Sequence, residues 1–243
     1  MMKRYYYDLH IHSCLSPCGD EDNTPNNIAG MASLSELDIV ALTDHNSCKN
    51  CPAFFIAAEN YGITPIAGME LTTSEDIHVV CLFEFLDDAL RFDDYVSKNR
   101  LLIKNRSEFF GEQLILDAED NLIGKEDFLL TSASDISIDD AYGIVKDFGG
   151  VCFPAHIDRD ANGIIAVLGT IPPNSPFLFY EIHDSSNIDK YCEKFGIDSE
   201  RIIVSTDSHN LAAIKDKENF FSLDCETADS NEVRKKLFEL LRS

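Results

Sequence analysis

The sequence predicts an α/β fold in which β-α units form a small barrel. Two observations support this fold class. Short apolar runs rich in β-branched and aromatic residues alternate with longer helical stretches, which is typical of strands joined by crossover helices. Seven or eight such units fit into the 243 residues, a number close to that of a β/α barrel.

The individual elements follow from this alternation. Strands are expected at residues 5–11, 39–43, 64–68, 78–83, 151–155, 177–182, 202–205 and 220–223. Helices are expected at residues 25–33, 51–61, 88–112, 138–148, 187–195 and 231–241. Helix boundaries support these ranges, since Thr24 can cap a helix that begins at Pro25, and Gly62 and Gly196 directly follow helices.

Residues 100–137 depart from the alternation and are interpreted as an insertion. Two short apolar runs at residues 114–116 and 122–124 flank an acidic turn, which is typical of a hairpin. No internal repeat and no linker rich in serine, glycine or proline divides the chain. We therefore expect a single domain over residues 1–243.

The net charge of the chain disfavours binding of nucleic-acid polymers. It contains 43 acidic and 20 basic residues, for a net charge of −23, whereas nucleic acids are bound by a surplus of Lys and Arg. Stable nucleic-acid binding is therefore not expected. A small anionic substrate remains compatible, because bound divalent metals can reverse the field inside a cleft.

The N-terminal segment lacks the apolar region of a signal peptide, and no apolar run approaches the ~18 residues of a membrane-spanning helix. We expect a cytoplasmic protein without a membrane partner, whose eight cysteines stay reduced. Two alternatives remain for the cysteines. One is a structural zinc site formed by Cys14, Cys18, Cys48 and Cys51, and the other is a redox-active pair of Cys48 and Cys51.

Histidines and carboxylates cluster at the ends of the expected strands. His10 and His12 end the first strand two residues apart, so that in extended chain both rings lie on the same side. Asp207 and His209 repeat this spacing after the strand at residues 202–205. Strand ends also carry His45, Glu70 and His156. Since the carboxyl ends of barrel strands form one rim, this joint occurrence predicts a metal cluster.

Five segments together resemble the PHP (polymerase and histidinol phosphatase) domain family. They are Asp8-Leu9-His10-Ile11-His12-Ser13, Leu42-Thr43-Asp44-His45, Gly68-Met69-Glu70, Pro154-Ala155-His156 and Ser205-Thr206-Asp207-Ser208-His209. The resemblance spans nearly the whole chain in the family's order. It implies a distorted seven-stranded β/α barrel and a centre of two or three divalent metals, Zn, Mn or Fe, that acts in phosphoester hydrolysis.

The resemblance also assigns ligands by position. His10, His12, Glu70 and Asp207 match the ligands of one metal, and Glu70 bridges to a second metal completed by His78 and His156. His45 and His209 match ligands of a third metal. Asp8 and Asp44 resemble carboxylates that orient neighbouring imidazoles by accepting their free N–H.

The remaining ligand of the third metal is where the chain departs from the family pattern. Relatives often carry Ser-Asp-Gly after the first motif, and the corresponding sequence here is Ser16-Pro17-Cys18-Gly19-Asp20-Glu21-Asp22. We favour Asp20, with Cys18 and Asp22 as alternatives. If none of them binds, the chain is a two-metal enzyme.

Phosphoester hydrolysis must bring an anionic nucleophile to an anionic phosphorus, and divalent ions remove this repulsion. We expect a metal-activated hydroxide near Glu70 to attack in line, with Glu70 and Asp207 as catalytic carboxylates. Arg159 is the candidate clamp for a substrate phosphate, unless it forms a salt bridge with Asp158 or Asp160. His183 is at most a substrate contact.

The sequence thus predicts a metal-dependent phosphoesterase, either phosphatase or phosphodiesterase, that acts on a small phosphorylated molecule such as a nucleotide. Two alternatives remain. One is an exonuclease-like phosphodiesterase on oligonucleotide ends, which needs a basic track that the sequence lacks near its motifs. The other is a non-catalytic metal-binding scaffold, against which the complete ligand set argues.

Overall fold

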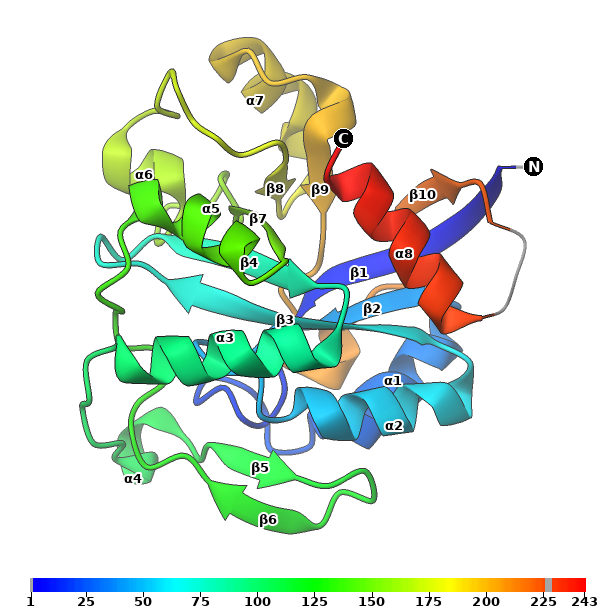
Figure 1. Cartoon of the computed structure of the whole chain (residues 1–243), viewed down its shortest axis with the longest axis vertical. Coiled ribbons are helices and arrows are strands. Elements are labelled where there is room, and N and C mark those ends of the chain that lie inside the picture. The colour runs from blue at the N-terminus through cyan, green and yellow to red at the C-terminus, as the bar shows by residue number, and fades with distance from the viewer. Residues whose placement is uncertain (1, 226–228) are drawn as a thin grey trace.

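A computed structural model describes residues 2–225 and 229–243. Its main element is a curled six-stranded sheet with the strand order β10-β1-β2-β3-β4-β7 (Figure 1). Two further pairs of strands, β5-β6 and β8-β9, lie outside this sheet. The predicted α/β class is confirmed.

Three neighbouring strands of the sheet are parallel, as expected for strands joined by crossover helices. Strands β1 (Lys3–Ile11), β2 (Ile39–Leu42) and β3 (Thr64–Thr72) run side by side in the same direction, joined by helices α1 (Pro25–Leu34) and α2 (Cys51–Tyr61). Every residue of β2 and β3 is buried; β2 is a continuous apolar run, as is the part of β3 before Glu70 that follows Thr64. Thr24 caps α1 as expected, since its side chain accepts the N–H of Asn27.

The expectation of a wholly parallel sheet is wrong for the next strands. Strand β4 (His78–Phe83) pairs antiparallel with β3, and β7 (Val151–Pro154) pairs antiparallel with β4. Only residues 73–77 join β3 to β4, and a loop this short cannot make the crossover that a parallel neighbour requires. Because β4 is reversed, its first residue His78 lies at the same edge as the carboxyl ends of β1, β2 and β3.

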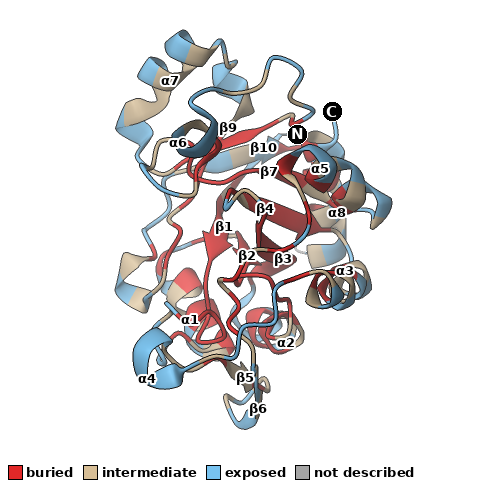
Figure 2. Cartoon of the chain, turned by 90° about the vertical axis from the view of Figure 1, so that its left-hand side faces the viewer, coloured by how far each residue is buried: buried red, intermediate tan, exposed pale blue. Residues whose placement is uncertain are grey.

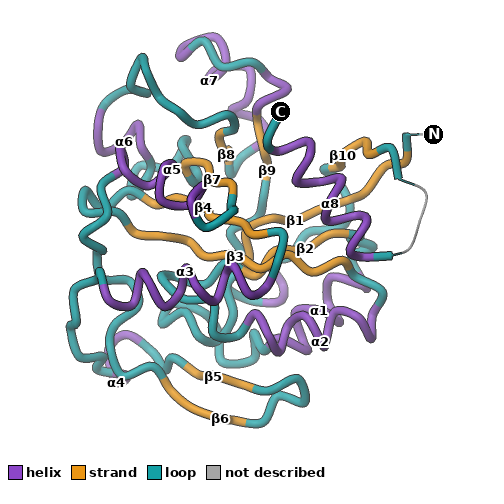
Figure 3. The backbone as a smooth tube through the Cα atoms, viewed as in Figure 1, coloured by secondary structure: helices purple, strands orange, loops and turns teal. Residues whose placement is uncertain are grey.

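The predicted helix at residues 88–112 is also wrong. Helix α3 (Leu86–Lys98) ends early, and only a single turn, α4 (Ser107–Phe110), follows. The chain between them is extended, because Arg100 and Lys104 form isolated bridges with Ser134 and Phe128. The predicted hairpin is present as β5 (Leu114–Leu116) and β6 (Leu122–Lys125), which project with α4 below the main sheet (Figure 3).

The last part of the chain carries the remaining strands. Helices α5 (Ile138–Asp147) and α6 (Ile164–Leu168) flank β7, and α6 falls in a segment where no helix was predicted. Strand β8 (Tyr180–Ile182) pairs in parallel with β9 (Ile202–Val204), with α7 (Ile188–Phe195) between them. Strand β10 (Phe220–Leu223) pairs antiparallel with the start of β1, and α8 (Ser230–Leu241) completes the chain.

The core lies on both faces of the curled sheet. One apolar cluster packs the sheet against α1, α2, α3 and α5, and a second joins the strands to α8. Figure 2 shows strands β2, β3 and β4 buried, with α4 and α7 largely exposed at the periphery. None of the helices in the described residues is long and apolar enough to span a membrane.

Candidate metal centre

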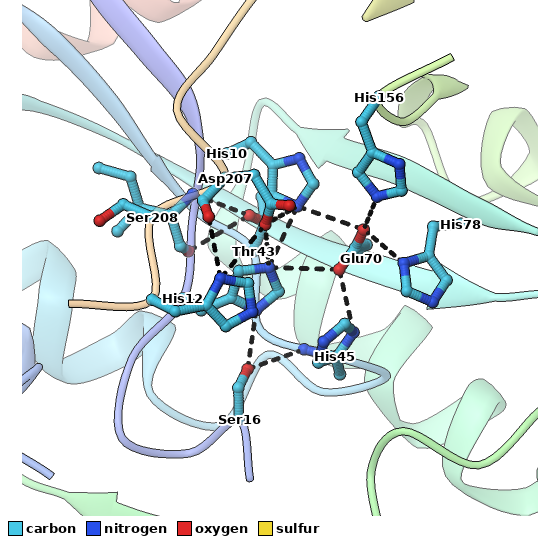
Figure 4. Close-up of polar contacts among 12 residues, drawn as sticks. His10, His12, Ser16, Thr43, His45, Glu70, His78, His156, Asp207 and Ser208 are labelled. Atoms are coloured by element: carbon cyan, nitrogen blue, oxygen red, sulfur yellow. Dashed lines mark hydrogen bonds and ion pairs between the residues drawn. The ribbon is translucent and has the colours of Figure 1, made fainter. Parts of the chain in front are cut away.

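Six histidines and two carboxylates meet at one edge of the sheet (Figure 4). Strand β1 supplies His10 and His12, β3 supplies Glu70, and β4 supplies His78. The segments that follow β2, β7 and β9 supply His45, His156, Asp207 and His209. His78 and His209 are half-buried and the others are buried. Side chains separated by up to 199 positions thus converge as the sequence predicted.

Glu70 lies at the centre of this cluster. Strand β3 extends past the predicted end at residue 68, so Glu70 stays within the ladder opposite Val80. Its carboxylate contacts five imidazoles: His78 Nδ1 at 2.8 Å, His45 Nδ1 at 2.9 Å, His156 Nε2 at 3.1 Å, His12 Nε2 at 3.2 Å and His10 Nε2 at 3.4 Å. A carboxylate with two oxygens facing five nitrogens is suited to bridge two cations.

The ligand atoms fall into three groups, each of which has all its atoms within 4.8 Å of one another. The groups are His10, His12, Glu70 and Asp207; His45, Glu70 and His78; and His12, His45 and His209. The first group is the set that the sequence assigned to one metal. In the second group His45 takes a place that the family resemblance assigned to His156, although His156 also contacts Glu70.

Charge inside the cluster shifts the pKa values in opposite directions. Burial alone would raise the pKa of Glu70 and of Asp207, but the surrounding histidines hold both well below the usual range. Burial would likewise lower the pKa of His12, but the nearby carboxylates of Asp207 and Glu70 raise it to about 9. Burial does lower the pKa of His45 to about 3 and that of His209 to about 4. Both rings are therefore neutral, as metal ligation requires.

Several buried polar atoms in the cluster lack a well-aligned hydrogen bond in the described structure. They are Glu70 Oε2, His45 Nδ1, Asp207 Oδ1 and His156 Nδ1, of which the first three lie 2.9–3.2 Å from one another or from His12 Nε2 without hydrogen-bond geometry. Leaving a buried polar atom without a good hydrogen bond costs about 1–3 kcal/mol, so four such atoms at one site favour the binding of a further group. A divalent cation is a partner for both carboxylate oxygen and imidazole nitrogen, and the donor set therefore fits metal ions.

In His12 and His209 the Nδ1 atom is hydrogen-bonded, so that the Nε2 atom of each ring faces the cluster. His12 Nδ1 contacts Ser16 Oγ at 2.9 Å, and His209 Nδ1 contacts the carbonyl of Asp207 at 2.9 Å. Each Nδ1–H is thereby engaged, which leaves Nε2 for a cation. The Ser16 hydroxyl in turn donates to Asp44 Oδ1 at 2.7 Å.

The expected roles of Asp8 and Asp44 need correction, because neither carboxylate touches an imidazole. Asp44 accepts from the backbone and side chains of Ser13 and Ser16, and so acts on His12 only through Ser16. Asp8 accepts from the backbone of His10 and from Thr206. These intermediate side chains were not predictable, since a serine or threonine near a histidine carries no signal of its own.

Burial raises the pKa of Asp8 to about 6, against an ordinary value of 3.8. Its contribution to stability is therefore complete below pH 3.8 and is lost as the pH rises through 6. Replacement by asparagine keeps the shape without the charge. In chelator, we compare the unfolding free energy of Asp8→Asn with that of wild type. The difference, variant minus wild type, is expected to be about 2–3 kcal/mol larger at pH 7 than at pH 4. Urea unfolding at both pH values measures this, and an equal difference at the two would contradict it.

The third-metal candidates of the sequence lie outside the three groups. Among residues 2–225 and 229–243, no candidate group contains Asp20, Asp22 or any cysteine. The N–H of Asp20 donates to the carbonyl of His209, but its carboxylate accepts the N–H of Asp22 at 3.1 Å. Cys18 is exposed. Asp20 as a ligand therefore stays a prediction.

The zinc site proposed for the cysteines is not assembled in the described chain. Cys48 Sγ and Cys51 Sγ point at the carbonyl of Gly68, at 3.1 and 3.7 Å, whereas Cys14 Sγ points at the carbonyl of Leu114. All eight cysteines are free, as expected. Seven of them are buried or half-buried, so they serve mainly as small apolar side chains.

Arg159 reaches the edge of the cluster. It forms an ion pair with Asp207 Oδ2 at 2.5 Å and contacts His183 at 3.3 Å. The alternative partner Asp158 is engaged elsewhere, since it accepts the backbone N–H of His183 at 2.8 Å. Arg159 also lines a cavity of about 350 Å³, together with six of the clustered side chains and residues 160–162. A cation and the cluster thus face one solvent-accessible space.

Two of the clustered residues have strained backbone. His156 has φ 28° and Asp207 has φ 49°, values that side chains other than glycine rarely adopt. Such strain persists where the surrounding structure enforces it, and it is common at functional sites.

One buried carboxylate at this site was missed by the sequence analysis. Glu181, in the middle of β8, is 1% exposed and contacts His10 and His156. Its signal was a single charged residue between Tyr180 and Ile182, in an otherwise apolar strand. A buried charge of this kind needs a partner, and that requirement was the available clue.

Comparisons with known proteins concern the family and the fold of the chain. A model of the PHP domain matches residues 8–169. In contrast, no curated protein matches the chain by sequence.

Three solved structures have a similar fold. Endonuclease Q of Pyrococcus furiosus, a lesion-specific endonuclease, matches with a TM-score of 0.62 and 16% identity, over 96% of this chain and 55% of its own. An amidohydrolase of Chromobacterium violaceum gives 0.56 and 17%, over 94% and 96% of the two chains. A protein of Bifidobacterium adolescentis assigned as a metal-dependent phosphoesterase gives 0.50 and 16%, over 98% and 97%. The chain spans about half the length of endonuclease Q.

Proposed function

Because the chain belongs to the PHP domain family, we propose that this metal-dependent hydrolase cleaves phosphoester bonds in a small phosphorylated molecule of nucleotide size. The observation that carries the proposal is the carboxylate of Glu70 facing five imidazoles beside a cavity. Divalent ions, when bound there, neutralise phosphate charge and lower the pKa of water. Zn, Mn and Fe are the candidate metals.

We assign the residues of the site as follows. The metal ligands are His10, His12, His45, Glu70, His78, His156, Asp207 and His209, with Asp20 as a further candidate. Glu70 would bind ions in both of the groups to which it belongs, and Asp207 completes the first group. The two shortest contacts of Glu70, with His78 and His45, fall in the second group, and His12, His45 and His209 would provide a third position.

Arg159 is the substrate clamp in this proposal. Its guanidinium lies on the wall of the cavity and carries N–H groups that can bind phosphate oxygens in pairs. The ion pair with Asp207 and the contact with His183 hold the side chain at the rim. A cavity of about 350 Å³ is within the range for small-molecule sites and supports a substrate of this size.

We further propose that the fold is the distorted seven-stranded barrel implied by the family, formed by β1, β2, β3, β4, β7, β8 and β9. Two contacts support closure: the N–H of Ile157 donates to the carbonyl of Glu181 at 2.9 Å, and Ile11 bridges Ser208. In this description residues 100–137 remain an insertion, with the β5-β6 hairpin packed on the segment that follows β1. The contact of Leu114 N–H with the carbonyl of Cys14 supports that placement.

Phosphodiester cleavage in oligonucleotides is the second candidate. The likeness to endonuclease Q, which has also been solved with a 27-mer duplex carrying an abasic lesion, favours it. The net charge of −23 weighs against it, because a polynucleotide is bound by many cations.

The test is a substrate panel. Loaded with Mn²⁺ or Zn²⁺, the purified protein is expected to hydrolyse p-nitrophenyl phosphate or bis-p-nitrophenyl phosphate and to prefer mononucleotides over a labelled oligonucleotide ladder. A preference for the ladder would favour the second candidate. A metal-replete protein inert on a broad panel of monoesters and diesters would rule out both.

A further inference from the structure

Glu181 contacts candidate metal ligands but is not one of them. It comes from the middle of β8, which pairs with β9 through Glu181 opposite Ile203. It belongs to none of the three ligand groups found among the described residues. Its side chain is nevertheless 1% exposed, so its charge is paired within the protein.

The two oxygens of this carboxylate engage two candidate ligands on different strands. His10 Nδ1 lies 2.9 Å from Oε2 and 3.1 Å from Oε1. The backbone N–H of His156 donates to Oε2 at 2.9 Å. One side chain thus joins the end of β1 to the end of β7 across the site.

Each contact fixes a different feature of the ligand that it touches. With Nδ1–H held by Glu181, the Nε2 atom of His10 is the nitrogen that faces Glu70 and Asp207, at 3.4 Å from each. The second contact holds the backbone of His156 at its strained φ of 28°, with Nε2 directed at Glu70 at 3.1 Å. Both rings depend on this carboxylate for their orientation toward the metals.

We propose that Glu181 is a positioning residue for the metal centre, which acts through His10 and His156 and is itself neither a ligand nor a substrate contact. This inference rests on the proposed metal-dependent function. Carboxylates in such a position typically contribute 10–100-fold to metal affinity. Glutamine cannot replace this one, because its amide has a single oxygen to accept from two N–H groups and adds an N–H donor facing one of them.

The experiment is calorimetric titration of chelator-treated protein with Mn²⁺. Glu181→Gln is expected to bind Mn²⁺ about 10–100-fold more weakly than wild type. The matched control is Glu193→Gln, the same change on the exposed face of α7, which should bind as wild type does. Circular dichroism in chelator verifies that both variants fold.

A double-mutant cycle separates positioning from a general structural effect. In a His10→Ala background, Glu181→Gln should weaken Mn²⁺ binding less than it does in wild type, because part of its action is transmitted by His10. This cycle stays informative if Glu181→Gln is less stable. Undiminished Mn²⁺ affinity in Glu181→Gln, or strictly additive effects, would overturn the inference. A wild type that binds no Mn²⁺ would instead overturn the proposed function.

Discussion

Replacement of Glu70 by glutamine is expected to reduce kcat/KM for p-nitrophenyl phosphate by about 10³-fold or more, because the variant loses the anion on which the ligand groups converge. Glu70 belongs to two of the three groups and contacts the rings of five histidines. Glutamine keeps the volume and one acceptor oxygen but not the charge that bridges two cations. Steady-state kinetics in saturating Mn²⁺ measure the effect.

The control for Glu70→Gln is Glu193→Gln, in which the same change occurs on an exposed helix. It should leave kcat/KM within about twofold of wild type, since exposed substitutions remote from a site rarely matter. Retention of more than a tenth of wild-type activity by Glu70→Gln would show that the clustered carboxylate is not central to the reaction.

Removal of divalent cations is expected to lower the thermal unfolding temperature by about 10 °C. A ligand present at about 1,000 times its Kd stabilises the folded state by about 4 kcal/mol, and each kcal/mol corresponds to about 2–4 °C in a chain of this length. The physical source is the set of buried polar atoms that lack a well-aligned hydrogen bond, which a cation would satisfy. Differential scanning calorimetry with EDTA, and again after addition of Mn²⁺, measures the change.

Glu70→Gln provides the internal reference for this measurement. Its unfolding temperature should respond little to EDTA or Mn²⁺, because two of the ligand groups are incomplete. An equal response in wild type and Glu70→Gln would mean that the stabilising cations bind elsewhere. No response in wild type would mean that the cluster holds no ion that contributes to folding.

The sequence predicted the elements whose signal is local. Strand β2 is a continuous apolar run, β3 begins at Thr64 as expected, and α2 begins at Cys51 and ends before Gly62 as expected. The reversal of β4 was not predictable from periodicity, because an apolar run has the same pattern in either direction. Only the short loop at residues 73–77 encodes that reversal.

The end of α3 could not be predicted from the sequence for a different reason. Residues 99–110 retain a helix-like composition, but Arg100 is buried and its guanidinium pairs with Glu126 at 3.0 Å. Long-range pairing therefore overrides local propensity. No reading of a local window could have found a partner 26 positions away.

The candidate site was predictable to the extent that its residues carry regular spacing. His10 and His12, and Asp207 and His209, were found in this way. Ser16 and Glu181 were not, because a serine or a single carboxylate among 43 acidic residues has no distinctive spacing. The role of Ser16 arises when the ends of β1 and β2 meet, and that of Glu181 arises when β8 meets the ends of β1 and β7.

The most direct test of the metal centre is anomalous diffraction from crystals soaked in Mn²⁺. We predict at least two anomalous peaks within bonding distance of the Glu70 carboxylate, one shared with His10, His12 and Asp207 and one shared with His45 and His78. Crystals of Glu70→Gln should lose these peaks. Mn²⁺-soaked wild-type crystals with no peak near Glu70, or with ions bound only at the protein surface, would contradict the metal centre described above.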